Sequence, residues 1–291
     1  MRAILDSHSD VRCGEESRII PRMLAMRENW LRNKKEAERL VQAGVDSSVI
    51  DSAISAFVLE TIAKHGEPAR VLCNKDPLTL KWGGYLASIF PNSKWLFMVR
   101  DGRAVIHSVI TRKVTISGYK LDDPRQCLGR WNNIVKTMNE QCNKIGPRRC
   151  MLVRYEQLVL HPRKWVSLIL DFLDLAWEDS VLHHERNINQ PGGVRVSNIE
   201  RSSDQIIKPI NSDALTSWVG FYDNATLDDM DSIAPMLSKM GYDPWDSHPT
   251  YGVADGEVVD NTNDVHKNKL AWQRKAEKLL AAMDKRNETE Q

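Results

Sequence analysis

The fold of this chain is decided by residues 94–112, which read KWLFMVRDGRAVIHSVITR. The uninterrupted apolar run over 95–99 predicts a strand buried on both faces, because strands with one exposed face alternate apolar and polar residues. Three residues that break this run, Arg100, Asp101 and Gly102, precede a helical pattern over 103–112. A strand that leads through a polar loop into a helix is typical of a parallel sheet covered by helices.

The same order of apolar run, polar loop and helical pattern occurs at two other places, over 70–89 and over 150–173. The sequence therefore predicts an α/β fold with a parallel sheet. Parallel strands end at the same edge of a sheet, so the loops at 74–76, 100–102 and 154–156 should converge on one crevice. Basic side chains at these places suit a polyanionic ligand such as a nucleotide. They are Lys75, Arg100, Arg103, Arg112 and Arg154.

Most of the remaining chain is predicted to be helical. Asp46 or Ser47 is suited to cap the N-terminus of a helix over 46–65. The polar stretch 187–211 is expected to be irregular, and 246–265 is expected to be a linker. Further helices are expected over 1–5, 16–30, 34–43, 124–143, 214–220, 227–241 and 266–286.

The composition argues against several classes of function. Lys plus Arg number 40 and Asp plus Glu 39, so the net charge of +1 gives no reason to expect a nucleic acid or a membrane surface as partner. The apolar runs are too short to span a bilayer, and the N-terminus has no signal-peptide pattern. Neither a phosphate-binding glycine motif nor a zinc-protease or hydrolase motif occurs. His183 and His184 are expected at the surface, because adjacent helical residues point about 100° apart.

The cysteines of the chain are Cys13, Cys73, Cys127, Cys142 and Cys150. No pair has C-x-x-C spacing, so a structural zinc site is not expected. Counting alone is equally compatible with free thiols and with disulfides. Two N-x-T sequons, at Asn224 and Asn287, are weak signals for glycosylation.

Five segments resemble the tyrosylprotein sulfotransferases and occur in the order typical of that family. They read RCGEESRIIPR (12–22), CNKDP (73–77), VRDGRAVIHS (99–108), YEQLV (155–159) and IERSSDQ (199–205). The resemblance runs from Met1 to about Gly252. It implies the sulfotransferase fold, a P-loop-NTPase-like parallel sheet flanked by helices, over 1–252. A polar linker and a C-terminal helical tail are expected over 253–291.

This resemblance implies transfer of a sulfuryl group from 3′-phosphoadenylyl sulfate to tyrosine hydroxyls in acidic segments of secretory proteins. A phenol has a pKa of about 10, so its attack at neutral pH needs a general base, and Glu16 matches that base in the family. Lys75 matches the lysine that neutralises the leaving oxygen, and Ser202 matches a serine that hydrogen-bonds the same transition state. No metal is expected, because fixed cations suffice for a sulfuryl group.

The resemblance also assigns contacts to the donor and to the peptide. Arg100 and Ser108 match ligands of the 3′-phosphate, and Arg112 matches a further donor contact; Ser108 and Arg112 share a helix face. Arg18 and Arg22 suit acidic residues around the target tyrosine. The other donor positions are Tyr155, Ser203, Asp204, Gln205, Lys208 and Asn211. The peptide segment consists of Arg18, Ile19, Ile20, Pro21 and Arg22, with Thr115 as a further contact.

The family works as a membrane-anchored homodimeric glycoprotein in the oxidising Golgi lumen, and the resemblance implies the same setting here. It pairs Cys13 with Cys73 and Cys142 with Cys150, which leaves Cys127 free. The first pair would hold the loop of Glu16 near the loop that carries the predicted cationic residue.

The chain departs from the family pattern at two places. On this resemblance we expect an incomplete gene model, an alternative start or a fragment, without the membrane anchor, the first strand and the 5′-phosphosulfate loop that the family has before the position of Met1. We therefore expect the 291-residue chain alone to be inactive and poorly stable. Ser217 stands where the family commonly has a donor-contacting lysine, and this serine is expected to weaken donor affinity.

Two other functions stay open at this point. One is a truncated, non-catalytic relative that only binds peptide or dimerises. The other is a transferase that acts on small molecules or glycans, against which the Arg18–Arg22 segment and the Cys13/Cys73 arrangement argue.

Overall fold

The computed structural model describes residues 1–190, 192–196 and 203–289. Its strands form two parallel ladders. β1 (Val11–Arg12) pairs with β2 (Val71–Leu72), and β3 (Trp95–Val99) pairs with β4 (Cys150–Arg154). Within the described residues no ladder joins the two pairs. The three predicted strands are confirmed, whereas β1 is an addition that its two-residue length hid from the sequence pattern.

Helices cover both faces of the β3–β4 ladder, and the side chains alternate between them as a pleated strand requires. Phe97 and Val99 pack into a cluster with α6 (Gly102–Thr111) and α7 (Pro124–Ile145). Leu96, Met98 and Val153 pack on the other face with α1 (Arg2–Asp6) and α9 (Pro162–Leu173). This two-sided burial explains why β3 reads as a continuous apolar run.

Gly102, the first residue of α6, lies close against Trp131 of α7. A Cβ atom at this position would lie 2.7 Å from the ring of Trp131 in α7. The glycine therefore allows α6 to start directly at the end of β3, with Asp101 as its N-cap: the Asp101 carboxylate accepts a hydrogen bond from the N–H of Arg103.

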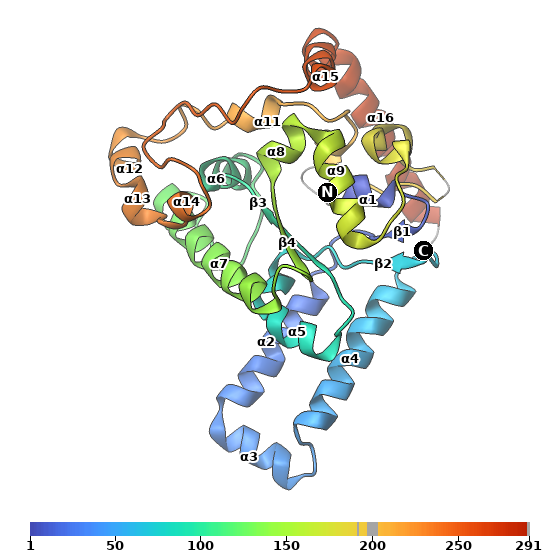
Figure 1. The fold of residues 1–291 in the computed structure, drawn as a ribbon, viewed down its shortest axis with the longest axis vertical. Helices are drawn as coiled ribbons and strands as arrows, with labels where there is room; N and C mark the ends of the chain where they lie inside the picture. Colours follow the sequence, from blue (N-terminus) through green and yellow to red (C-terminus); the bar gives the residue numbers. More distant parts are fainter. Residues whose placement is uncertain (191, 197–202, 290–291) are drawn as a thin grey trace.

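Three helices form an arm that projects from the body of the molecule (Figure 1). They are α2 (Ile19–Arg32), α3 (Lys34–Gln42) and α4 (Ser47–Lys64). Asp46 caps α4 as predicted, because its carboxylate accepts hydrogen bonds from the N–H groups of Ser48 and Val49. The arm shares an apolar cluster with α5, in which Ile20, Leu24 and Ile54 of the arm are fully or almost fully buried together with Leu86.

The C-terminal half contains mainly short helices. The region predicted as one helix over 227–241 is covered by three short helices instead, and Pro235 separates the last two of them. The remaining elements are η1 (Pro77–Trp82), α5 (Gly83–Ile89), α8 (Tyr155–Leu160), η2 (Asp179–Leu182), η3 (His184–Arg186), α10 (Ser203–Ile206), α11 (Asp213–Thr216), α12 (Asn224–Asp228), α13 (Met230–Ile233), α14 (Met236–Lys239), α15 (Gly256–Lys267) and α16 (Lys269–Thr289).

Two of our expectations for the polar segments are wrong. The segment predicted as a linker over 246–265 becomes the helix α15 from Gly256 onward, and its Val258 and Val265 are buried. His184 is buried rather than at the surface, and this burial lowers its pKa to about 4. The helix α16 packs against the body of the protein, because Ala276 lies in one apolar cluster with Ile188 and Ile207.

None of the described helices has both the length and the apolar character that a membrane span requires.

Candidate active site

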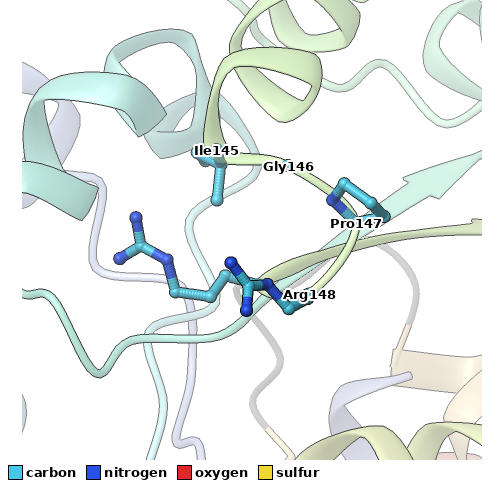
Figure 2. A pocket seen from close by; sticks show the side chains of 5 residues that line it. Ile145, Gly146, Pro147 and Arg148 are labelled. Carbon is cyan, nitrogen blue, oxygen red and sulfur yellow. The ribbon is translucent and has the colours of Figure 1, made fainter.

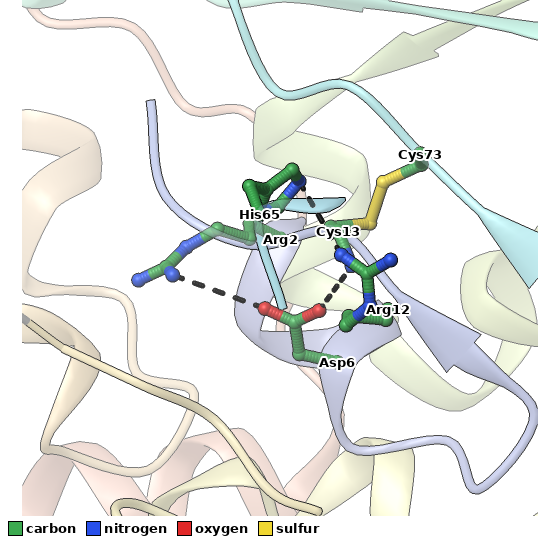
Figure 3. Close-up of a disulfide and its surroundings, with 6 residues drawn as sticks. All are labelled: Arg2, Asp6, Arg12, Cys13, His65 and Cys73. Carbon is green, nitrogen blue, oxygen red and sulfur yellow. Dashed lines mark hydrogen bonds and ion pairs between the residues drawn. A yellow bond between two sulfur atoms is a disulfide. The ribbon is translucent and has the colours of Figure 1, made fainter. Parts of the chain in front are cut away.

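A disulfide between Cys13 and Cys73 joins the chain directly after β1 to the chain directly after β2 (Figure 3). The Cα atoms of the two cysteines lie 4.4 Å apart. Below them the buried carboxylate of Asp6 accepts a hydrogen bond of 2.6 Å from the N–H of Cys13. Burial raises the pKa of Asp6, and Arg2 approaches the same carboxylate at 3.8 Å. The two loops that follow β1 and β2 are thus fixed to each other and to α1.

The Glu16 carboxylate and the Lys75 ammonium meet across these two loops. Glu16 Oε2 lies 3.2 Å from Lys75 Nζ, and Glu16 Oε1 accepts a hydrogen bond of 2.8 Å from Arg18 Nε. The two side chains are 22% and 31% exposed, so the pair is open to an incoming ligand at the surface. The structure therefore brings the predicted base together with the predicted cation.

The Asp76 carboxylate forms a further connection between the same two loops. Its carboxylate accepts hydrogen bonds from the Ser17 hydroxyl at 3.0 Å and from the Arg18 N–H at 2.6 Å. Arg18 has a φ of 59°, in the left-handed region that non-glycine residues rarely adopt. Such strain persists where surrounding contacts hold the backbone, and it concentrates at functional sites.

The carboxyl ends of β3 and β4 form a second cluster of predicted site residues. The Arg100 guanidinium lies 4.7 Å from the centre of the Tyr155 ring and also donates a hydrogen bond to the Ala214 carbonyl. Burial raises the pKa of Tyr155. Arg112, at the end of α6, forms two hydrogen bonds to the Asp204 carboxylate, of 2.7 and 3.3 Å. The segment that carries Arg100 and Arg112 therefore contacts two other segments of the predicted donor site, at Tyr155 and at Asp204.

Arg103 does not take part in this cluster, contrary to the sequence prediction. Its side chain is fully buried and pairs with the equally buried Asp101 at 2.8 Å. Its guanidinium also lies 4.4 Å from the Trp218 ring centre and donates to the Asp246 carbonyl at 2.7 Å. Arg103 therefore faces the core, where it ties the start of α6 to the C-terminal half of the chain.

The remaining predicted positions are distributed as follows. Ser202 lies outside the described residues. Ile20 and Pro21 are buried, so their side chains face the core of the arm, whereas Arg18, Ile19 and Arg22 are exposed. The carbonyl of Thr115 accepts a hydrogen bond of 3.3 Å from Arg18. Of the other donor positions, Ser203 is buried, Gln205 is exposed, and Ser108, Lys208 and Asn211 are half-buried.

Two acidic residues of the site went unnoticed in the sequence. Glu156 and Asp76 each stand inside a quoted motif, YEQLV or CNKDP, but nothing in the pattern distinguishes a structural carboxylate from a solvated one. Both accept backbone N–H groups of neighbouring loops, from Asp101 and Arg18 respectively. Only their position could have indicated them, because each is an acidic residue in a motif that follows a predicted strand.

A hollow lies away from these clusters. It measures about 520 Å³ and is lined by residues 145–149, at the amino end of β4 (Figure 2). The strand-end clusters lie at the opposite edge, so this hollow does not correspond to the predicted crevice. Among the described residues, no group of three or more His, Cys, Asp or Glu side chains is arranged to hold a metal ion.

The carboxylate–ammonium pair thus follows the carboxyl ends of the β1–β2 ladder, and the arginine cluster follows those of the β3–β4 ladder, on a parallel α/β fold. A model of the Sulfotransferase family matches residues 1–179, and the chain belongs to this family. A solved sulfotransferase domain from the Curacin biosynthetic pathway has a TM-score of 0.58 over 83% of this chain and 92% of its own, at 16% identity, and supports the fold.

Relatives narrow the membership to the protein-tyrosine sulfotransferases. The protein-tyrosine sulfotransferase of Drosophila melanogaster is 56% identical over 96% of this chain and 56% of its own length. Protein-tyrosine sulfotransferase 2 of Gallus gallus is 57% identical over 92% of this chain and 72% of its own length. For protein-tyrosine sulfotransferase 1 of Homo sapiens the values are 55%, 93% and 73%. The chain thus spans little more than half of the Drosophila relative.

Proposed function

We propose that the protein transfers a sulfuryl group from 3′-phosphoadenylyl sulfate to tyrosine hydroxyls in acidic segments of secretory proteins. The tyrosine oxygen forms a bond to sulfur while its proton passes to the Glu16 carboxylate. The bond between sulfur and the bridging oxygen breaks, and 3′,5′-adenosine diphosphate leaves. Lys75 neutralises the charge that develops on this oxygen, and Ser202 donates a hydrogen bond to the same transition state.

The observation that carries this proposal is the 3.2 Å contact between Glu16 Oε2 and Lys75 Nζ. Base and cation must act on two bonds to one sulfur atom, so they must lie within a few ångströms of each other. The residues are far apart in the sequence, and the Cys13–Cys73 disulfide joins their loops. A positioned base typically contributes about 10²- to 10⁴-fold to the rate.

The arginine cluster supports a donor with several phosphate groups. Arg100 and Arg112 lie at successive places along the β3–α6 unit, and Tyr155 stacks on the first of them. Fixed guanidinium groups bind phosphate in a bidentate manner, which favours a nucleotide such as the proposed donor. The exposed Arg18 and Arg22 provide the positive charge for an acidic peptide.

We further propose that the protein works in the Golgi lumen as a membrane-anchored glycoprotein. Two disulfides, Cys13–Cys73 and Cys142–Cys150, support an oxidising compartment, because disulfides rarely persist in the cytosol. The exposed Asn224 is available for glycosylation.

We propose that the protein is a homodimer. Side chains of the arm support this, because Met26, Trp30, Leu31 and Val41 are large, apolar and exposed on α2 and α3. Exposed apolar groups that lie on one projecting element are typical of an interface. Sedimentation velocity tests this proposal. We expect the wild type to be a dimer and Trp30→Glu to be a monomer. A monomeric wild type would contradict the proposal.

Transfer of labelled sulfate is the test of the activity. The natural protein, with its disulfides intact, is incubated with ³⁵S-labelled donor and an acidic peptide that contains one tyrosine. We expect label in this peptide and none in its phenylalanine analogue or in a glycan acceptor. Label in the glycan instead would show a different transferase. A protein that binds the peptide but neither transfers label nor binds 3′,5′-adenosine diphosphate in calorimetry would be the non-catalytic relative.

A further inference from the structure

Helix α15 lies against residues 210–214, a segment that includes the predicted donor position Asn211. The backbone N–H of Ser212 donates a hydrogen bond of 3.1 Å to Thr262 Oγ1, and the two hydroxyls lie 3.1 Å apart. One residue earlier in α15, Asn261 Nδ2 donates to the Ile210 carbonyl at 3.1 Å. Figure 1 shows α11 and α15 at the same edge of the molecule. The helix therefore holds this segment by its backbone.

The helix is itself anchored to the body of the protein. The N–H of Asp255 donates to the Leu160 carbonyl at 2.9 Å, and its carboxylate lies 2.9 Å from His161 Nδ1. Val258 and Val265 are buried with exposed fractions of 0% and 3%. A helix held at its start and along one apolar face provides a rigid support, which a solvated linker would not.

The supported segment contacts the donor cluster directly. The Arg100 guanidinium donates a hydrogen bond to the Ala214 carbonyl, two residues after Ser212. Leu215 and Ile210 pack in one apolar cluster with Tyr155, the residue whose ring faces Arg100. A displacement of residues 210–214 would therefore move both partners of the Arg100 guanidinium.

We propose that α15 positions the donor site, with Thr262 and Asn261 as positioning residues. This inference rests on the proposed function, since it assumes that Arg100 binds the donor. Thr262 acts through the backbone: its hydroxyl fixes Ser212, and Ser212 fixes the segment whose Ala214 carbonyl orients the Arg100 guanidinium. The ion pair between His266 and Asp213 has a minor role, because the His266 side chain is 66% exposed.

The test compares four variants by calorimetry with 3′,5′-adenosine diphosphate and, separately, with the acidic peptide. Thr262→Val keeps the shape of the side chain but removes the acceptor for Ser212. We expect it to raise the Kd for the nucleotide about five- to tenfold, because the backbone N–H of Ser212 is then left without its acceptor and residues 210–214 are held less firmly. The Kd for the peptide should stay within about twofold. Asn261→Ala should raise the nucleotide Kd about two- to fivefold.

Two matched variants separate positioning from general damage. Thr262→Ser keeps the hydroxyl and should restore nucleotide binding to within about twofold of wild type. Thr137→Val removes a threonine that, like Thr262, donates to the carbonyl four residues earlier in its helix, at 3.0 Å for Thr137 and 2.7 Å for Thr262. It has no loop to position, so its nucleotide Kd should not change.

The outcomes distinguish this inference from the proposed function. Failure of the wild type to bind the nucleotide would contradict the function itself. Wild-type binding together with unchanged Kd values in Thr262→Val and Asn261→Ala would overturn the role of α15 alone. If Thr262→Val does not fold, Asn261→Ala decides the question. In the transfer assay, Thr262→Val and Asn261→Ala should show a higher KM for the sulfuryl donor than the wild type, with kcat retained. An equal loss of kcat/KM for the donor and for the peptide would contradict the role of α15.

Discussion

The Glu156 carboxylate connects the ends of the two central strands by accepting the backbone N–H of Asp101 at 2.9 Å. Its second oxygen accepts the hydroxyl of Tyr242 at 2.8 Å. Asp101 follows Arg100 directly in the sequence. By holding the backbone of Asp101, the Glu156 carboxylate fixes the position of Arg100 at the end of β3. Glu156 is nearly fully buried, and burial raises its pKa.

Glu156→Gln should destabilise the fold by about 1–3 kcal/mol, because a glutamine side chain has only one acceptor oxygen. Its NH₂ group would face one of the two hydrogen-bond donors, so one of the two hydrogen bonds would be lost. Urea unfolding followed by tryptophan fluorescence measures this loss. Glu67→Gln, on the exposed surface, is the control and should change stability by less than about 0.5 kcal/mol. Equal stability of the two variants would contradict the role given to Glu156.

The same carboxyl group predicts a dependence on pH. Its pKa in the folded protein is raised above the ordinary value of 4.5, so the folded state holds the proton more tightly than the unfolded chain does. This contribution to stability is complete below pH 4.5 and is lost as the pH rises through the raised pKa. Relative to Glu156→Gln, the wild type should therefore gain stability as the pH falls through this window. A constant difference between the two proteins would contradict the raised pKa.

The strands that support this arrangement could be predicted because each is buried on both faces. β3 and β4 read as continuous apolar runs for this reason, and their parallel pairing places Arg100 beside Tyr155. β1 could not be found, because two residues between polar neighbours carry no periodic signal. For α15 the polar surface was misleading, since Val258 and Val265 are its only buried residues.

The predicted site residues were found by resemblance, whereas their supports needed the structure. Nothing in the sequence shows that Arg103 turns inward to Asp101 while Arg100, three residues earlier, stays at the strand end. A basic residue in a loop has the same appearance in a sequence whether it binds a ligand or a buried carboxylate. Three-dimensional partners decide this, and apart from Asp101 those of Arg103 include Asp246 and Tyr222, which are more than 100 residues away in the sequence.

The two disulfides should differ in their effect on stability. Cys13–Cys73 spans 60 residues and Cys142–Cys150 spans 8. In the chain-entropy model the longer loop contributes about 4 kcal/mol and the shorter about 2.5 kcal/mol. We expect Cys13→Ser/Cys73→Ser to lower the free energy of unfolding more than Cys142→Ser/Cys150→Ser does, in urea titrations without reductant. Transfer activity should also fall further in the first variant, since only this disulfide joins the loops of Glu16 and Lys75. The reverse order in both measurements would argue against that assignment.

The stacking of Arg100 on Tyr155 should contribute to donor affinity. Tyr155→Leu removes the aromatic face and should raise the Kd for 3′,5′-adenosine diphosphate about two- to thirtyfold, which corresponds to the usual strength of a cation–π contact. Tyr155→Phe keeps the ring and serves as the matched control. Calorimetry on both variants measures the effect, and equal affinities would show that the ring does not orient the arginine.

Glu16→Gln should abolish most of the transfer while it leaves the fold and donor binding in place. The amide keeps the shape of the side chain but cannot take the phenolic proton, so kcat should fall about 10²- to 10⁴-fold. Glu36→Gln, an equivalent change on the distant α3, should have no effect. A peptide with 3-fluorotyrosine provides a second readout: its more acidic phenol ionises more readily, so it depends less on a base. Replacing tyrosine by 3-fluorotyrosine in the peptide should therefore change the transfer rate of the wild type less than that of Glu16→Gln. The fluorinated peptide should recover part of the activity that the variant loses. If Glu16→Gln shows the same relative loss with both peptides, Glu16 has a role other than proton transfer.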